Sequence, residues 1–130
     1  MFNILVVDDS KVARKRVVNT LEIADSQCNI LATAEDGKEG LDKYIEFRPN
    51  LVITDIEMPN MDGREFISKL KQLNNDLPII AITSIVNEKV KKTLTAHKLV
   101  YVLHKPLDTK LLNMLLSKLQ KEILPIWRGV

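Results

Sequence analysis

The stretch that decides the fold is LVITDIEMPNMDG, residues 51–63. Its first four residues are mostly β-branched and include no Pro or Gly, which predicts a buried strand. Asp55 ends this run, although an unpaired carboxylate is costly inside a buried strand. At the carboxyl end of a parallel strand, an acid can instead face the crevice where open α/β sheets bind ligands. The stretch therefore raises the hypothesis of a functional acid at a strand end.

Short apolar runs alternate with segments of helical spacing along the whole chain. The predicted strands are residues 2–7, 28–34, 50–54, 78–82 and 99–103. Ser10 and Asp36 precede the first two helical segments as candidate N-caps. The last helix is expected to begin after Asp108 and to carry a broad apolar stripe: Leu111, Leu112, Leu115, Leu116, Leu119 and Ile123. Further helices are expected near residues 62–73 and 86–96. Five strands alternating with five helices predict an α/β fold, in which helices cover both faces of a parallel sheet.

Length and composition indicate one domain with a real core, since 45% of the 130 residues are apolar. We expect this domain to span residues 1–124, with Pro125 ending the last helix and residues 125–130 forming a short tail. Cys28 is the only cysteine, so it cannot form an intramolecular disulfide and is expected to be a small buried hydrophobe. No apolar run approaches the roughly 18 residues of a membrane span, and no signal peptide is recognisable, so the default expectation is a cytoplasmic protein.

The charges are distributed unevenly along the chain. Residues 1–65 hold 8 Lys/Arg and 13 Asp/Glu, a balance of −5, whereas residues 66–130 hold 11 and 4, a balance of +7. Solvated helix faces are the ordinary explanation of such runs. The alternative is an acidic site in the first half and a basic partner-facing surface in the second. The overall charge of +2 is too small to indicate a nucleic-acid partner.

Polar residues end four of the five predicted strands. Asp8 and Asp9 follow the first strand, Asp55 the third, Thr83 the fourth and Lys105 the fifth. Each has an ordinary explanation alone, as a helix cap, a strand residue or a surface lysine. If these strands are neighbours, however, all five side chains converge on one edge of the sheet.

Three carboxylates at one edge would repel one another, by ~1 kcal/mol per pair at 4 Å in water and ~4 kcal/mol at an effective dielectric of 20. A divalent cation relieves that repulsion, and a set of oxygen ligands suits Mg²⁺. Zinc is not indicated, because His97 and His104 are isolated and no Cys or His cluster has metal-ligand spacing. A hard metal, a carboxylate nucleophile, a hydroxyl and a lysine together suit phosphoryl transfer.

At this point the sequence resembles the response-regulator receiver domain, the phospho-acceptor module of two-component signalling. The resemblance covers residues 2 to about 122, and in length the chain looks most like the stand-alone chemotaxis type. It is carried, in the family's order and approximate spacing, by VVDDS, AEDGKEGL, RPNLVITDIEMPNMDG, AITS and HKP. It implies a doubly wound parallel sheet of five strands in the order 2-1-3-4-5 with five helices, which would supply the required adjacency.

The resemblance also implies a role for each acid. Asp55 matches the phospho-acceptor, and Asp8 and Asp9 match the acidic pair that holds Mg²⁺, with Asp9 favoured as the direct ligand. The metal ligands would then be Asp8, Asp9, Asp55 and the backbone carbonyl of Glu57. The phosphoryl group would come from a histidine kinase or a phosphotransfer protein.

The remaining motif residues match the family's switching elements. Thr83 matches the hydroxyl residue that reorients towards the phosphoryl group, and Lys105 the lysine that pairs with it. Pro106 matches a proline that follows a cis peptide bond. Pro59 and Gly63 are expected to shape the turn after Asp55, Gly63 by adopting a conformation that other residues resist.

Three positions depart from the family's pattern. Val102 stands where an aromatic residue is usual, and Tyr101 is one place earlier, which on a strand puts it on the opposite face. Residues 97–99 read HKL in place of Ala-Gly-Ala, and Ser84 replaces a common Ala. These departures concern how a signal would leave the site and not the phosphorylation residues.

The leading hypothesis is a receiver that is phosphorylated on Asp55 and thereby changes its affinity for a partner, without being a multiple-turnover enzyme. The output partner would bind the face formed by the fourth helix, fifth strand and fifth helix, with neither nucleic acid nor membrane insertion involved. One alternative is an excised receiver from a longer regulator. A haloacid-dehalogenase-type phosphatase is a further alternative, but Glu57 stands where its second Asp is needed. A flavodoxin-like electron carrier is another, but there is no Gly-rich or hydroxyl-rich phosphate loop.

Overall fold

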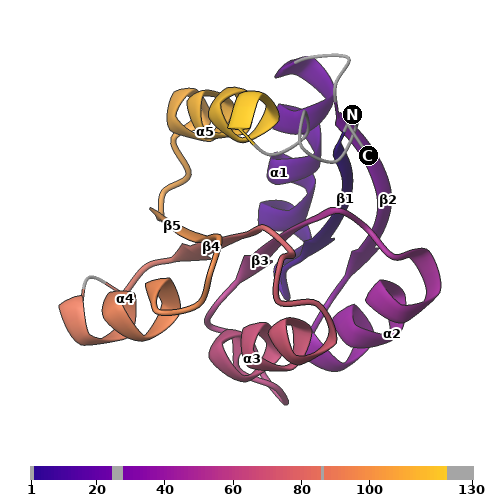
Figure 1. Cartoon of the computed structure of the whole chain (residues 1–130). Coiled ribbons are helices and arrows are strands. Elements are labelled where there is room, and N and C mark those ends of the chain that lie inside the picture. The colour runs from indigo at the N-terminus through magenta and orange to yellow at the C-terminus, as the bar shows by residue number, and fades with distance from the viewer. Residues whose placement is uncertain (1, 25–27, 86, 123–130) are drawn as a thin grey trace.

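Five strands and five helices alternate along the chain in a computed structural model, which describes residues 2–24, 28–85 and 87–122 (Figure 1). The strands are β1 Phe2–Val7, β2 Cys28–Ala34, β3 Leu51–Asp55, β4 Ile79–Thr83 and β5 Val100–His104. The helices are α1 Lys11–Ala24, α2 Gly37–Phe47, α3 Gly63–Leu73, α4 Glu88–Thr95 and α5 Thr109–Glu122.

The strands form one parallel sheet in the order β2-β1-β3-β4-β5, which confirms the order that the resemblance implies. The central strand β3 pairs with β1 through Val6 and Ile53 and with β4 through Ile53 and Ile80. For β3, β4 and β5 the predicted ranges were shifted by one residue, because each observed strand begins and ends one residue later. Asp55 and Thr83 are therefore the last residues of their strands.

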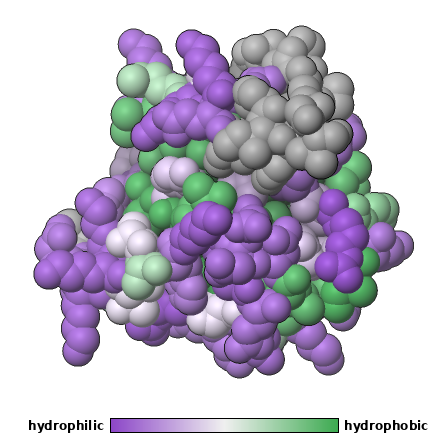
Figure 2. All heavy atoms as spheres, viewed as in Figure 1, coloured by the Kyte–Doolittle hydropathy of each residue, from purple (hydrophilic) through white to green (hydrophobic). Residues whose placement is uncertain are grey.

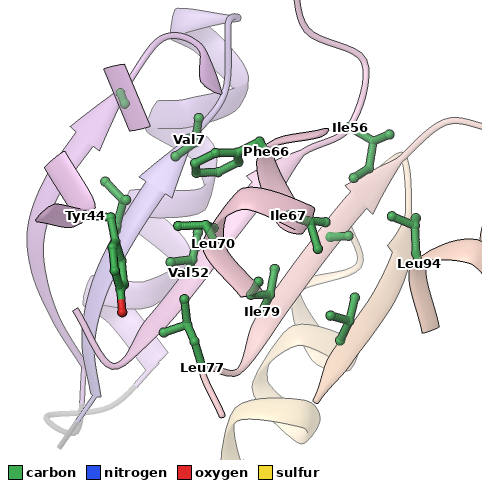
Figure 3. Packing of buried hydrophobic residues seen from close by; sticks show 14 residues of the cluster. Val7, Tyr44, Val52, Ile56, Phe66, Ile67, Leu70, Leu77, Ile79 and Leu94 are labelled. Atoms are coloured by element: carbon green, nitrogen blue, oxygen red, sulfur yellow. The ribbon is translucent and has the colours of Figure 1, made fainter. Parts of the chain in front are cut away.

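Helices cover both faces of the sheet, as predicted. On one face α1 and α5 pack through Val17, Leu21, Leu112, Leu116 and Leu119. On the other face α2, α3 and α4 pack through Tyr44, Phe66, Ile67, Leu70 and Leu94 (Figure 3). All five residues of β3 are buried, because this strand is the centre of the sheet and helices cover both of its faces. The phospho-acceptor candidate, Asp55, thus sits at the end of a fully buried strand.

The predicted N-caps of α1 and α2 are confirmed. Ser10 Oγ accepts a hydrogen bond from Ala13 N at 3.2 Å, and Asp36 Oδ1 accepts one from Glu39 N at 2.8 Å. The side-chain carboxylate of Glu39 accepts a hydrogen bond from Glu35 N at 3.4 Å. Glu39 therefore binds the backbone of the residue before the cap, whereas in a standard capping box it would bind the backbone N–H of the cap residue itself.

Gly63 does shape the turn after Asp55, but the predicted reason, an unusual backbone conformation, was wrong. No glycine in the described residues has a positive φ, and the left-handed residue of this loop is Asn60, with φ 66°. Gly63 is required because of close approach: a Cβ there would lie 2.5 Å from Ile56 Cα and 2.6 Å from the Asp55 carbonyl oxygen. Gly63 N also donates to the Ile56 carbonyl at 2.9 Å. The glycine allows α3 to begin directly against the end of β3.

The buried face of α5 is narrower than predicted. Leu111 is half exposed, and the helix fills the core through Leu112, Leu116 and Leu119. Ile123, Pro125 and the tail at 125–130 lie outside the described residues. Cys28 is only partly buried, although it packs against the core as expected.

A lysine is buried at the other end of the sheet. Lys71 of α3 is 6% exposed, and its ammonium donates to the carbonyl oxygens of Asn75 at 3.0 Å, of Leu77 at 2.6 Å and of Lys98. Burial lowers the pKa of Lys71 to about 8. The Lys71 side chain links the loop before β4 to the loop before β5, and β5 is part of the face formed by α4, β5 and α5.

The surface in Figure 2 is mainly hydrophilic over α4, and hydrophobic atoms emerge between α4 and α5. The lysines of this region are exposed: Lys89, Lys91, Lys92, Lys98 and Lys110. Lys98 is paired with Asp76 at 2.6 Å. Within the described residues, no helix has both the length and the apolar character needed to cross a bilayer.

Candidate functional site

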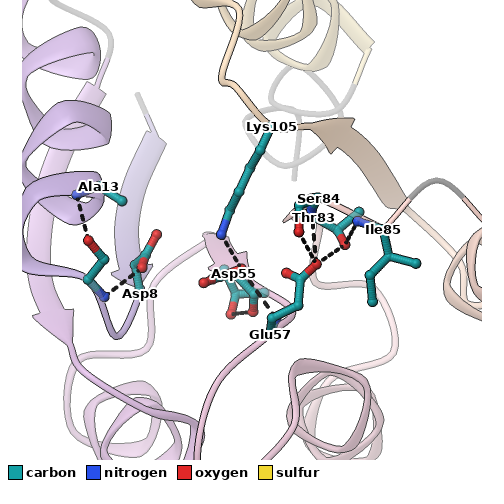
Figure 4. A network of polar contacts seen from close by, with 10 residues as sticks. Asp8, Ala13, Asp55, Glu57, Thr83, Ser84, Ile85 and Lys105 are labelled. Carbon is teal, nitrogen blue, oxygen red and sulfur yellow. Dashed lines mark hydrogen bonds and ion pairs between the residues drawn. The ribbon is translucent and has the colours of Figure 1, made fainter.

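The order of the strands brings the predicted polar residues together at the carboxyl edge of the sheet. Asp55 ends β3 and is 2% exposed, and Lys105 follows β5. Lys105 Nζ lies 3.0 Å from Asp55 Oδ1, having reached across the end of β4 (Figure 4). Lys105 and Pro106 are joined by a cis peptide bond, as the resemblance implies.

Three acids form a cluster at this edge. Ligand oxygens of Asp8, Asp9 and Asp55 lie within 4.8 Å of one another. Asp8 is buried and its Oδ1 accepts from Ser10 N at 2.8 Å, whereas Asp9 is exposed. Arg14 Nη1 donates to the backbone carbonyl of Asp8 at 2.7 Å. The sequence reasoning missed Arg14, although its place one turn into α1 could have indicated a contact with the strand end.

Thr83 and Ser84 are engaged by the side chain of Glu57. Glu57 Oε1 accepts from Thr83 Oγ1 at 2.7 Å, from Ser84 N at 2.9 Å and from Ser84 Oγ at 3.0 Å. The second oxygen, Oε2, is buried without a hydrogen-bond partner in the described part of the chain. The sequence reasoning considered only the backbone carbonyl of Glu57, and it treated Ser84 only as a departure from the family's pattern.

The pKa values of the two neighbouring carboxyls move apart. Burial, together with the contact with Glu57, raises the pKa of Asp55 to about 7, against the opposing effect of the Lys105 ammonium. Burial would also raise the pKa of Glu57, but hydrogen bonds from Thr83 and contact with Asp55 hold it below its ordinary range. The negative charge of this pair is therefore held mainly on Glu57 when no cation is bound.

In Asp8 and Lys105, too, burial and neighbouring groups shift the pKa in opposite directions. Burial raises the pKa of Asp8, although Ser10 N–H and Lys105 oppose that rise. Burial would lower the pKa of Lys105, but the hydrogen bond and charge of Asp55 raise it overall. One ammonium thus faces several acids, which leaves excess negative charge for a cation to neutralise.

The donor set fits a hard divalent cation. All candidate ligands are oxygens, two of the three carboxylates are buried, and the raised pKa values of Asp8 and Asp55 reflect uncompensated burial of charge. Mg²⁺ takes one or two carboxylates and keeps several waters, which an edge with exposed Asp9 would allow. The cluster is the only group of this kind among the residues described by the structure.

A hollow of about 110 Å³ opens beside Asp8 and Lys105. Its remaining walls are mainly aliphatic: Ala13, Arg16, Val17, Ile82, Pro106 and Leu107. Cofactor pockets are usually ~300–1,000 Å³, so this hollow is too small for a flavin. It weighs against the electron-carrier alternative.

The two residues that depart from the family's switch lie on opposite faces of β5, as predicted. Tyr101 packs against the core beneath α1 and α5, and Val102 packs against the core beneath α2, α3 and α4. Val102 is partly buried. The face of β5 that contacts α4 therefore carries no aromatic ring at this position.

An acidic edge facing a lysine on a sheet of order 2-1-3-4-5 defines a class of signalling domain. The chain belongs to the response regulator receiver domain family, whose sequence model matches residues 4–117. This places it in two-component signalling and confirms the resemblance.

The chain is similar in sequence to part of several longer proteins named protein-glutamate methylesterase/protein-glutamine glutaminase. A protein-glutamate methylesterase/protein-glutamine glutaminase from Nocardioides sp. is 41% identical over 93 residues, which are 72% of this chain and 25% of that protein. The chain thus spans about a quarter of the length of the curated relatives it matches.

Solved structures of chemotaxis receivers are also similar. One is the CheX-CheY-BeF3-Mg complex from Borrelia burgdorferi, with a TM-score of 0.82, 30% identity and coverage of 90% of this chain and 88% of that one. Another is the chemotaxis protein CheY4 from Vibrio cholerae, with a TM-score of 0.79, 31% identity and coverage of 91% and 98%.

Proposed function

We propose that this receiver accepts a phosphoryl group on Asp55 from a histidine kinase or phosphotransfer protein and then changes its affinity for an output partner. The observation that carries the proposal is the pairing of buried Asp55 with Lys105 at 3.0 Å, inside a cluster of three acids. The phospho-acceptor unit is taken as residues 1–124, with 125–130 as a tail.

The transfer has a simple balance of atoms and charge. An oxygen of the Asp55 carboxylate attacks the phosphorus of the donor, and the bond from phosphorus to the donor's imidazole nitrogen breaks. The electron pair leaves with the imidazole, which takes up a proton from solvent, and an acyl phosphate remains on Asp55. Lys105 is placed to neutralise a phosphoryl oxygen as a point charge, since its ammonium already contacts Asp55. Thr83 ends the neighbouring strand and would donate its hydroxyl to another oxygen.

The metal is part of the proposal. Asp8, Asp9, Asp55 and the backbone carbonyl of Glu57 would hold Mg²⁺, with Asp9 as the preferred direct ligand. When bound, Mg²⁺ supplies neutralisation of charge on the phosphoryl oxygens. The protein's own contribution is to hold Asp55 buried and oriented at the strand end, where it is 2% exposed.

Multiple-turnover catalysis is not part of the proposed role. A haloacid-dehalogenase-type phosphatase needs a second acid free to transfer a proton to its substrate. Glu57, at the corresponding position, accepts three hydrogen bonds from Thr83 and Ser84 and is held in its charged form. Hydrolysis of the acyl phosphate would return Asp55 and inorganic phosphate once per phosphorylation.

The output partner is proposed to bind the face formed by α4, β5 and α5, where the exposed lysines lie next to hydrophobic atoms (Figure 2). A second candidate for the output follows from the 41% identity to a methylesterase/glutaminase, which exceeds the 30–31% identity to the chemotaxis receivers. In that case the partner is a methylesterase domain, in the same chain or another. A binding assay between the phosphorylated receiver and an isolated methylesterase domain would separate the two.

The phosphorylation is tested by incubation with acetyl phosphate and Mg²⁺. We expect one added phosphoryl group by mass, and we expect Asp55→Asn to abolish the addition. Asp9→Asn should weaken Mg²⁺ binding in a titration, because it removes a candidate ligand. Labelling that persists in the Asp55→Asn variant would move the acceptor to another residue, and an unchanged Mg²⁺ affinity would move the metal away from Asp9.

A further inference from the structure

The side chain of Glu57 occupies donors that a phosphoryl group on Asp55 would need. Its Oε1 accepts from the hydroxyl of Thr83 and from both the backbone N–H and the hydroxyl of Ser84, at 2.7–3.0 Å. Figure 4 shows this carboxylate between Asp55 and the end of β4. A carboxylate and a phosphoryl group are both oxyanions and compete for the same donors.

The hydroxyl of Thr83 is fully committed in this arrangement. It donates its proton to Glu57 and accepts a hydrogen bond from Ile85 N at 3.0 Å. A hydroxyl has one proton to donate, so Thr83 cannot bind a phosphoryl oxygen until Glu57 releases it. The movement expected of Thr83 on phosphorylation therefore requires Glu57 to move first.

Charge repulsion would also displace the Glu57 carboxylate when Asp55 is phosphorylated. Glu57 Oε2 is buried without a hydrogen-bond partner in the described residues, so only Oε1 of this carboxylate is held by donors. A phosphoryl group with about two negative charges at pH 7 would repel this carboxylate at close range. The position of the Glu57 side chain is therefore favourable while Asp55 is unphosphorylated and becomes unfavourable when Asp55 carries a phosphoryl group.

We propose that the carboxylate of Glu57 acts as an internal competitor, holding Thr83 and Ser84 in the unphosphorylated arrangement until a phosphoryl group displaces it. This inference rests on the proposed phospho-acceptor role of Asp55. Glu57 is a positioning residue, because it acts through Thr83 and Ser84. The hydroxyl of Ser84 strengthens the competitor by one hydrogen bond, which an alanine there would not supply.

The experiment measures binding of beryllofluoride, a tetrahedral phosphoryl analogue, in the presence of Mg²⁺ by calorimetry. Glu57→Ala should bind it about tenfold more tightly than the wild type, because the anion no longer displaces a charged acceptor. Glu57→Gln should lie between the two, and Ser84→Ala should gain about threefold because one donor is lost. Glu65→Ala is the control, since it removes an exposed carboxylate of α3 that pairs only at 3.8 Å with Lys69.

A second measurement uses neither Mg²⁺ nor an anion. The Ser84 amide hydrogen should exchange about tenfold faster in Glu57→Ala than in the wild type, since its acceptor is removed. Equal beryllofluoride affinity across the series, or an unchanged Ser84 exchange rate, would overturn the role of Glu57 while leaving phosphorylation of Asp55 intact. If none of the proteins binds beryllofluoride, the phospho-acceptor role itself fails and the inference fails with it.

Discussion

Two glycines in this chain form a matched pair that tests why Gly63 is required. Gly37 and Gly63 each begin a helix, and each follows an aspartate that caps it, Asp36 and Asp62. A Cβ at Gly63 would lie 2.5 Å from the Cα of Ile56, in the backbone after β3. At Gly37 the three atoms nearest to an added Cβ all belong to the side chain of Met61, the closest at 2.9 Å. The same substitution therefore meets a rigid obstacle at one site and a flexible one at the other.

We expect Gly63→Ala to lower the free energy of unfolding by about 1–2 kcal/mol. Overpacking against a fixed neighbour typically costs ~1–3 kcal/mol, and loss of chain entropy in the unfolded state returns only ~0.4–1 kcal/mol. Gly37→Ala should change the free energy of unfolding by less than ~1 kcal/mol, because a methionine side chain can rotate away. The clash at Gly63 also involves the Asp55 carbonyl oxygen at 2.6 Å, so labelling of Asp55 by acetyl phosphate should slow in that variant alone.

Urea unfolding measures the difference directly. With a slope of ~2 kcal/mol per molar urea, a loss of ~2 kcal/mol moves the midpoint down by about 1 M. The slope should stay the same in both variants, which would show that the folded and unfolded states keep their compactness. Equal midpoints for Gly63→Ala and Gly37→Ala would refute the close-approach argument, and so would normal labelling of Asp55 in a destabilised Gly63→Ala.

Three further outcomes follow from individual lysines. Lys105→Ala should still accept some phosphoryl group but lose the activated response of its backbone amide spectrum, and an unaltered response would refute its role. Lys71→Met should lower the free energy of unfolding by ~2–4 kcal/mol in a urea titration, because three carbonyl oxygens lose a charged donor, whereas exposed Lys69→Met should change it by less than ~0.5 kcal/mol. The double change Lys91→Glu/Lys92→Glu should weaken binding of an output partner at low salt, and binding that ignores both salt and the double change would make these lysines solubilising residues only.

Most of the architecture could be predicted because it depends on apolar periodicity. The five runs and their helical spacers are read directly from the sequence, and the errors at strand ends were single residues. Strand order could not be derived this way, because no local pattern records which strands are neighbours. The order came from the resemblance to receivers, and the pairing of β1 with both β2 and β3 bears it out.

The site shows where prediction from sequence stops. The strand ends placed Asp55 and Lys105 at the same edge of the sheet, and the strand order implied by the resemblance brought them together. The contact of Glu57 with Thr83 depends on a loop conformation and a rotamer, neither of which leaves a periodic signal in the sequence. The reason for Gly63 was missed on the same ground, because close approach to Asp55 is a property of the packed loop and is not visible in the residue type.

The raised pKa of Asp55 makes stability depend on pH in a direction that can be worked out. The folded protein holds a proton on Asp55 up to about pH 7, whereas an ordinary aspartate releases it near 3.8. Between these values the folded state binds more protons than the unfolded state, so this group's contribution to stability falls as pH rises from about 4 to 7.

Asp55→Asn cannot ionise and should escape this loss. Without Mg²⁺ we expect Asp55→Asn to exceed the wild type by about 1–2 kcal/mol at pH 8, with a much smaller excess at pH 4.5. Adding Mg²⁺ at pH 8 should narrow the excess, because a bound cation stabilises the ionised wild type. Asp42→Asn, on the exposed face of α2, is the matched control and should show no such dependence on pH or Mg²⁺. An Asp55→Asn excess of equal size at pH 4.5 and pH 8 would show that buried charge at the end of β3 is not what opposes folding there.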